Sequence, residues 1–167
     1  MSKSNHVPLV RRDLVYPEHW STNRPKVHIV FSVEHFDIAE KLVNDLRYEL
    51  VEKHKFSPLN IRLTQAESIH EIPLYIARVS SRSDIVYAVG VELESEPTHE
   101  PRLLDLLTRR IDALTVKGCL PVFDCILVRQ SRDQLLSQIQ ALEEQGSTLA
   151  ATWARRGVDT YTALSRH

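Results

Sequence analysis

A chain of 167 residues is long enough for one domain with a hydrophobic core, and 43% hydrophobic with 26% charged residues is typical of a globular protein. A net charge of −1 argues against a general affinity for nucleic acid or an anionic membrane. No apolar run is long enough to span a membrane, and the N-terminus lacks the apolar stretch of a secretory signal. We therefore expect a reduced, cytoplasmic protein in which Cys119 and Cys125 are buried and form no disulfide.

The chain divides into an N-terminal arm over residues 1–25 and one domain over residues 26–167. The arm is polar and contains three prolines, which is typical of a disordered segment. It also carries Val7, Leu9, Tyr16 and Trp20, whose apolar side chains favour burial. Docking of the arm on a neighbouring subunit is therefore the alternative.

The first half of the domain alternates β-branched apolar runs with amphipathic segments. Asp37 is expected to be the N-cap of the first helix, and Pro73 fits the first turn of the second. The expected elements are a strand over 26–33, a helix over 37–55, a strand over 60–64, a polar loop over 65–70 and a helix over 71–81.

The second half begins with the apolar run Ile85–Val89, which predicts a strand buried on both faces, with Gly90 near its end. Glutamates and His99 follow. Gly118 is expected to end the next helix, and Ser131 to cap the one after. The expected elements are a helix over 101–117 with Leu103, Leu106, Leu107, Ile111 and Leu114 inside, a strand over 120–128, and helices over 131–145 and 147–164.

This alternation predicts an α/β fold, a three-layer αβα sandwich with a parallel four-stranded sheet and helices on both faces. Ligands of such sheets bind at the carboxyl ends of the strands, where His99 is expected. The chain has only four glycines and no Gly-x-Gly or P-loop pattern, so a phosphate site must be built without a glycine cradle.

Four segments together resemble the 6,7-dimethyl-8-ribityllumazine synthase family of riboflavin biosynthesis. Each resembles a family motif in the same order and at similar spacing. They are His70–Leu74 (HEIPL), Asp84–Gly90 followed by His99, Leu120–Phe123 (LPVF) and Gly157–Leu164 (GVDTYTAL).

The resemblance implies a flavodoxin-like sandwich that forms homopentamers, in some members assembled further into decamers or icosahedral shells. It also implies active sites between adjacent subunits that condense a ribitylamino-pyrimidinedione with 3,4-dihydroxy-2-butanone 4-phosphate. The family needs no cofactor. By this resemblance His99 is the proton-handling catalytic residue.

The resemblance also places two sets of ligand contacts. The residues expected to bind substrate are Glu34, His35, Phe36, Ile69, His70, Glu71, Val91, Glu92, Leu93 and Asp124. The residues expected to bind phosphate are Ser95, Thr98, Arg155 and Arg156.

The chain departs from the family pattern at these contacts. Glu34 and His35 replace an aromatic-Asn pair, Ser68-Ile69 replaces Gly-Ala, and Asp124 replaces a phenylalanine. The family's Arg-Gly-x-Thr loop is replaced by Glu-Ser-Glu-Pro at residues 94–97, where Pro97 removes a backbone donor and the glutamates repel phosphate. Each like-charge contact at about 4 Å costs about 4 kcal/mol at an effective dielectric constant of about 20. The family's Gly-Thr-Lys-x-Gly-Asn motif is absent.

Several residues have a structural alternative. His99 is either an acid–base residue or a plain helix-entry histidine. Glu71 either binds ribityl hydroxyls or opposes a helix dipole, and the two arginines either bind phosphate or form a solvated helix face. Three glutamates, Glu92, Glu94 and Glu96, lie near His99 but form no tight ligand set, so we expect no metal.

Two functions from different classes follow. The first is an enzyme, a divergent lumazine synthase or a relative that performs a similar amine–carbonyl condensation. The second is a non-catalytic oligomeric paralogue that binds a flavin-like, pterin-like or cationic ligand, or serves as a scaffold. In either case we expect a small-molecule ligand at a subunit interface. A retained phosphate site would favour the enzyme.

Overall fold

Four parallel strands form one sheet in the order β2-β1-β3-β4. The computed structural model describes residues 25–95, 101–118 and 120–165, so the predictions on residues 1–24 of the arm and on Glu96, Pro97, Thr98, His99 and Cys119 lie outside the described part. The strands are Val27–Ser32 (β1), Ile61–Ala66 (β2), Ile85–Leu93 (β3) and Val122–Arg129 (β4).

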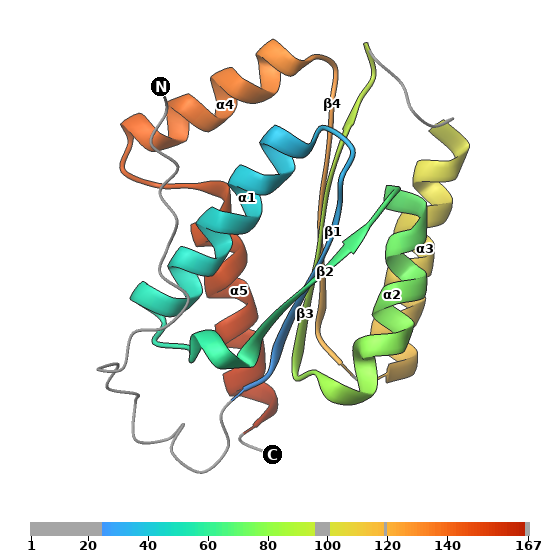
Figure 1. Cartoon of the computed structure of the whole chain (residues 1–167), viewed down its shortest axis with the longest axis vertical. Helices are drawn as coiled ribbons and strands as arrows, with labels where there is room; N and C mark the ends of the chain where they lie inside the picture. Colours follow the sequence, from blue (N-terminus) through green and yellow to red (C-terminus); the bar gives the residue numbers. More distant parts are fainter. Residues whose placement is uncertain (1–24, 96–100, 119, 166–167) are drawn as a thin grey trace.

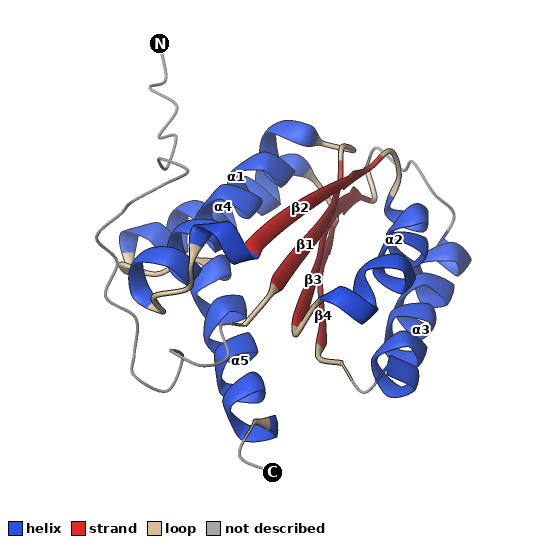
Figure 2. Ribbon diagram, turned by 60° about the horizontal axis from the view of Figure 1, so that its bottom comes forward, coloured by secondary structure: helices blue, strands red, loops and turns tan. Residues whose placement is uncertain are grey.

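Helices cover both faces of the sheet, as Figures 1 and 2 show. On one face lie Phe36–Tyr48 (α1), Arg132–Glu144 (α4) and Leu149–Leu164 (α5), and on the other lie Ile72–Val79 (α2) and Pro101–Gly118 (α3). The three-layer αβα sandwich with a flavodoxin-like parallel sheet is therefore confirmed. Within the described residues, no helix combines the length and the apolar character needed to cross a bilayer.

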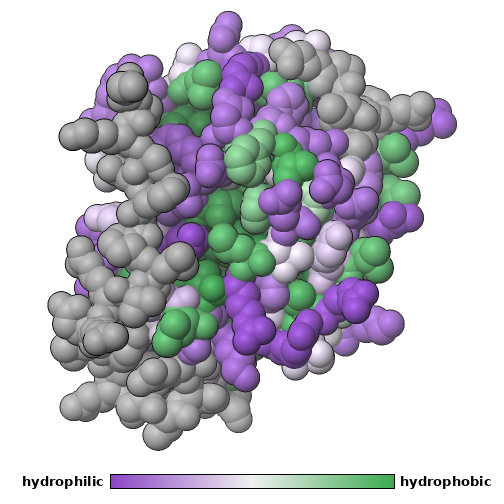
Figure 3. Space-filling model, in the orientation of Figure 1, coloured by the Kyte–Doolittle hydropathy of each residue, from purple (hydrophilic) through white to green (hydrophobic). Residues whose placement is uncertain are grey.

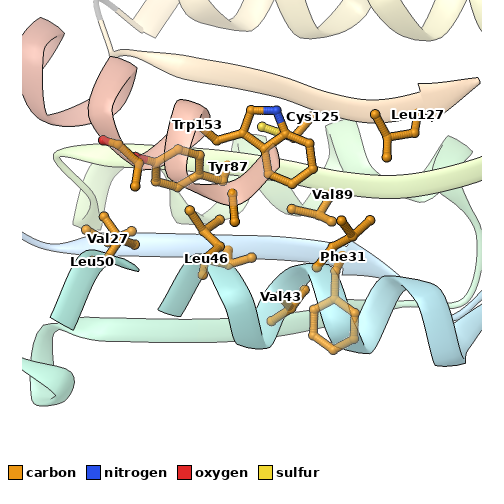
Figure 4. Close-up of a cluster of buried hydrophobic side chains, with 14 of the residues drawn as sticks. Val27, Phe31, Val43, Leu46, Leu50, Tyr87, Val89, Cys125, Leu127 and Trp153 are labelled. Carbon is orange, nitrogen blue, oxygen red and sulfur yellow. The ribbon is translucent and has the colours of Figure 1, made fainter. Parts of the chain in front are cut away.

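Side chains that alternate along the strands pack into two hydrophobic cores, one on each face of the sheet. On the α1–α4–α5 face, Tyr87 of β3 is fully buried beside Trp153 of α5 and the apolar side of α1 (Figure 4). On the other face, Val30, Val86 and Ala88 pack against α2 and α3. Burial of β3 on both faces, with all nine of its residues buried, confirms the expectation for the apolar run.

Short helical turns link the main elements. A π-helical turn over Glu49–Lys53 continues α1, and Pro58–Asn60 (η3) precedes β2. Ile69–Glu71 (η4) leads into α2, and Ser80–Arg82 (η5) leaves it. Pro73 lies in the first turn of α2, as expected, and α3 ends at Gly118. Ser131 caps α4, its Oγ accepting the N–H of Gln134 at 3.2 Å.

Gly90 lies near the end of β3, as expected, and the strand continues to Leu93 because Val91 and Leu93 extend its apolar run despite the charge between them. Three other expectations on the elements were wrong. His35, not Asp37, is the N-cap of α1. Leu103 and Leu106 are 38% and 40% exposed, since the inward stripe of α3 runs through Leu107 and Ile111 instead. The loop over 65–70 is replaced by the end of β2 and by η4.

The edge strands leave apolar residues at the surface. Leu63 of β2 is 41% exposed, and Leu59, in the turn η3 before this strand, is 73% exposed. Figure 3 shows hydrophobic atoms between hydrophilic ones in the middle of the face where β2 crosses in Figure 1. Cys125 of β4 is buried, and burial raises the pKa of its thiol, in line with the expected role as a small hydrophobe.

Candidate functional site

Three segments meet where β1, β2 and β3 end, at the upper edge of the sheet in Figure 1. The N–H of Val33 donates to the carbonyl of Ala66 at 3.0 Å, which joins the ends of β1 and β2. The turn η4 packs closely on β3, since a Cβ at Gly90 would lie 2.8 Å from Cγ2 of Ile69. Glycine at position 90 therefore allows the site segments to approach one another.

Glu34 ties the first two segments together. Its Oε2 accepts the backbone N–H of Ile69 at 2.9 Å and the hydroxyl of Ser32 at 3.1 Å. The Ser32 hydroxyl oxygen in turn accepts the N–H of Glu34 at 3.1 Å. A carboxylate thus replaces the aromatic ring of the resembled pattern, and it occupies the backbone N–H of Ile69.

His35 and Phe36 follow at the same edge. His35 has left-handed backbone angles, φ 50° and ψ 49°, a region in which histidine, like asparagine, is enriched among non-glycine residues. Histidine therefore fits the backbone position of the family's asparagine. Its carbonyl accepts the N–H groups of Ile38 and Ala39, while its buried Nε2 has no hydrogen-bond partner among the described residues. Phe36 is 46% exposed and offers an apolar surface.

The turn η4 holds His70 and Glu71. Ser68 caps this turn, with its Oγ accepting the N–H of His70 at 3.2 Å. Oε2 of Glu71 accepts the N–H of Glu67 at 3.0 Å. One oxygen of Glu71 therefore stabilises its own loop, and its other oxygen accepts no hydrogen bond from the described residues.

At the end of β3, only one of the three predicted residues faces the site. Val91 and Leu93 are fully buried in the core beneath α1, α4 and α5, so only their backbone groups are placed to contact a ligand. Glu92 is 1% exposed and, by the alternation of the strand, lies on the α2–α3 side together with Ser32 of β1.

The predicted phosphate segment begins directly after β3, and its first donors are already used. The N–H of Glu94 donates to the carbonyl of Arg129 at 2.9 Å, and the N–H of Ser95 donates to that of Gln130 at 2.8 Å. These bonds hold the start of the turn against the end of β4. Ser95 is exposed, so its hydroxyl remains available.

The predicted arginines lie elsewhere in the same chain. Arg155 and Arg156 are exposed on α5, and the guanidinium carbon of Arg156 lies 5.8 Å from the ring centroid of Phe123. Phe123 pairs with Tyr87, six residues before Leu93, which is about 20 Å along the strand from the carboxyl edge. Within one subunit the structure does not bring these arginines to Ser95.

Asp124 is also distant from the edge. It pairs with Ala88, about 16 Å before the end of β3. Although Asp124 is an exposed residue, its carboxyl group lies against α3, and burial raises its pKa. Asp112 raises this pKa further, while the hydrogen bond from the N–H of Ile126 at 3.0 Å lowers it.

Three cations near the carboxyl edge were missed by the sequence reasoning. Arg129 ends β4 and donates to Oε1 of Gln138 and to the carbonyl of Val128, each at 2.8 Å. Arg132 forms an ion pair with Asp37 across the starts of α4 and α1. Arg102 is exposed in the first turn of α3. Each of these arginines lies next to an expected end of a strand or helix, and this position in the sequence could have indicated that it lies at the carboxyl edge. Among the described residues, no cluster of three or more side chains suits a metal ion.

The comparison with known families assigns this fold to a family. No curated protein matches the chain. The family described as 6,7-dimethyl-8-ribityllumazine synthase matches residues 24–161, which include all four strands and every segment of the candidate site. The chain therefore belongs to the 6,7-dimethyl-8-ribityllumazine synthase family.

Proposed function

We propose that this chain catalyses the family's condensation of a ribitylamino-pyrimidinedione with 3,4-dihydroxy-2-butanone 4-phosphate, at a reduced rate and without a cofactor. The observation that carries the proposal is the convergence of three segments at the carboxyl edge of a family-matched sheet. A cytoplasmic location belongs to the same proposal.

The residues of the edge suit separate roles. The exposed ring of Phe36 stacks on the pyrimidine, and Oε1 of Glu71 accepts hydrogen bonds from ribityl hydroxyls. His99 transfers protons as the amine nitrogen attacks the carbonyl carbon and water leaves. Ser95 and Thr98 supply hydroxyl donors to the phosphate.

The remaining predicted ligands serve a neighbouring subunit in this proposal. Arg155, Arg156 and Asp124 lie about 16–20 Å from the carboxyl edge of their own chain, so a shared site needs a second copy. We propose a ring of five, as in the resembled family. Light scattering should give about 96 kDa, five times the 19.2 kDa chain, or a multiple of it. A monomer at micromolar concentration contradicts the shared site.

The reduced rate follows from the phosphate segment. Both backbone donors at its start are bonded to the carbonyls of Arg129 and Gln130, Pro97 lacks a donor, and Glu94 and Glu96 add negative charge. We expect phosphate to bind in the millimolar range, which corresponds to about 4 kcal/mol or less.

A turnover assay with both family substrates tests the activity. We expect slow formation of the lumazine product, which His99→Ala abolishes while the oligomer stays intact. His54→Ala is the matched control, since His54 lies beyond α1 and away from the carboxyl edge. Turnover at the rate of a family member with the full motif contradicts the electrostatic reasoning. Undiminished turnover in His99→Ala contradicts the assignment of the site.

A non-catalytic paralogue is the second candidate, and the bonded N–H groups of Glu94 and Ser95 favour it. Such a protein keeps the ring-binding part of the site and lacks the phosphate part. Titration with riboflavin separates the two functions. Saturable riboflavin binding with no detectable turnover supports the paralogue, and turnover that His99→Ala removes supports the enzyme.

A further inference from the structure

A pocket lies at the opposite edge of the sheet, at the amino ends of β1 and β2. It has a volume of about 240 Å³ and is lined by side chains from the start of β1, the start of β2 and the turn η5. Since β1 has six residues, about 20 Å of strand separate this pocket from the carboxyl edge. The pocket is thus distinct from the candidate site described above.

Three cations from three separate segments line this pocket. Lys26 precedes β1, Arg62 belongs to β2 and Arg82 ends η5. Among the described residues, none of the three side chains forms an ion pair, and no acidic side chain lines the pocket. The nearby carboxylate of Asp84 accepts the backbone N–H of Lys26 at 2.7 Å. The described lining therefore carries three cationic side chains, with Asp84 as a carboxylate beside it.

His28 is the buried polar member of the lining. It is 8% exposed, and its Nε2 lies 2.6 Å from the hydroxyl oxygen of Thr64. Burial lowers the pKa of His28, and the positive charges of Arg62 and Arg82 lower it further. The same pocket lining contains His28 together with both arginines, which places their charges around one small volume.

We propose that this pocket binds the phosphate group of a small phosphomonoester, with Lys26, Arg62 and Arg82 as its cations. Guanidinium groups match phosphate oxygens through paired N–H donors, and a lysine ammonium adds a point charge. Leu59, 73% exposed at the rim, supplies an apolar surface for the rest of the ligand. The pocket thus combines an anion site with a small hydrophobic contact.

Calorimetric titration of the full chain with inorganic phosphate and with ribose 5-phosphate tests the proposal. We expect saturable binding that weakens by about tenfold or more in Arg62→Gln and in Arg82→Gln. Arg78→Gln is the matched control, because Arg78 is an exposed arginine on α2 outside the lining. Its dissociation constant should stay within about twofold of the unmodified protein.

Two results would overturn the proposal. One is an absence of saturable binding of either probe. The other is an equal dissociation constant in all three arginine variants, which assigns any binding to the carboxyl edge about 20 Å away. Histidine-selective NMR supplies a second readout, since phosphate in the pocket shifts the ring resonances of His28, and unshifted resonances at saturation contradict the site. The variants should retain the melting temperature of the unmodified chain because both arginines are exposed.

Discussion

Replacement of Gly157 by alanine should destabilise the protein through a direct clash between α5 and β3. A Cβ at this position would lie 1.9 Å from the Tyr87 hydroxyl oxygen and 2.8 Å from its Cζ. Tyr87 is fully buried, and its ring stacks on Phe123 with 5.4 Å between centroids. Because protein cores are close-packed, a fully buried ring has little room to move, so we expect the helix to shift away from the sheet.

Two opposing effects set the magnitude. Overpacking of a core costs about 1–3 kcal/mol. Because the added Cβ would overlap the Tyr87 hydroxyl severely, we expect a cost of about 3 kcal/mol. Alanine in a helix interior is about 1 kcal/mol more favourable than glycine, which offsets part of this cost. The net loss in free energy of unfolding is about 2 kcal/mol, which corresponds to about 4–8 °C in melting temperature for a chain of this size.

Thermal unfolding at matched protein concentration measures the loss. Gly118→Ala is the control, since its Cβ would meet only Leu120 at an ordinary 3.6 Å. Tyr87→Phe removes the closest clashing atom, and the hydroxyl it removes makes only a long contact of 3.5 Å to the carbonyl of Ala154. The double variant with Gly157→Ala should therefore recover part of the stability. A Gly157→Ala protein that melts at or above the unmodified protein would refute the packing described here.

Three further predictions concern pH and assembly. The pKa of His28 in the folded protein lies below 6.5. The free energy of unfolding, measured by denaturant titration, should therefore fall as the pH drops below about 6.5 and through that lower pKa. His28→Gln should make this fall smaller. Because the folded pKa of Asp124 lies above 3.8, Asp124→Asn should raise the melting temperature at pH 7, with a gain that shrinks as pH falls toward 4. An unchanged melting temperature at pH 7 contradicts the burial of that carboxyl. Deletion of residues 1–20 should lower the melting temperature or loosen the oligomer, whereas no change in either indicates a free arm.

The order and type of the main elements were predictable because each carries a local signal. The β-branched run at Ile85–Val89 and the cap at Ser131 depend on neighbours in sequence, and both predictions were confirmed. The choice between Leu103 and Leu107 as the inward face of α3 depends on how the helix is rotated against the sheet. Helical periodicity defines a stripe only approximately, so sequence alone assigned too wide an inward face.

The carboxyl edge on which we place the candidate site was predictable from the sequence, and its bonding was not. Parallel topology places the ends of β1, β2 and β3 at one edge, which sequence alternation already indicated. The bond from Ile69 N–H to Glu34 joins residues 35 positions apart, and the bonds of Glu94 and Ser95 reach across to β4. No local pattern encodes such contacts, because they depend on the exact approach of separate loops.

The bonding of Glu34 bears on how this chain diverged from its family. A carboxylate introduced by a random substitution need not find hydrogen-bond donors around it. A buried polar group without a hydrogen bond costs about 1–3 kcal/mol or more. Here the carboxylate accepts the N–H of Ile69 and the hydroxyl of Ser32, and it links two site segments. The carboxylate at position 34 is therefore accommodated by hydrogen bonds within the edge. We propose that this edge, where the N–H groups of Glu94 and Ser95 are already bonded, favours the amine-bearing substrate over the phosphate-bearing one, in line with weak phosphate binding.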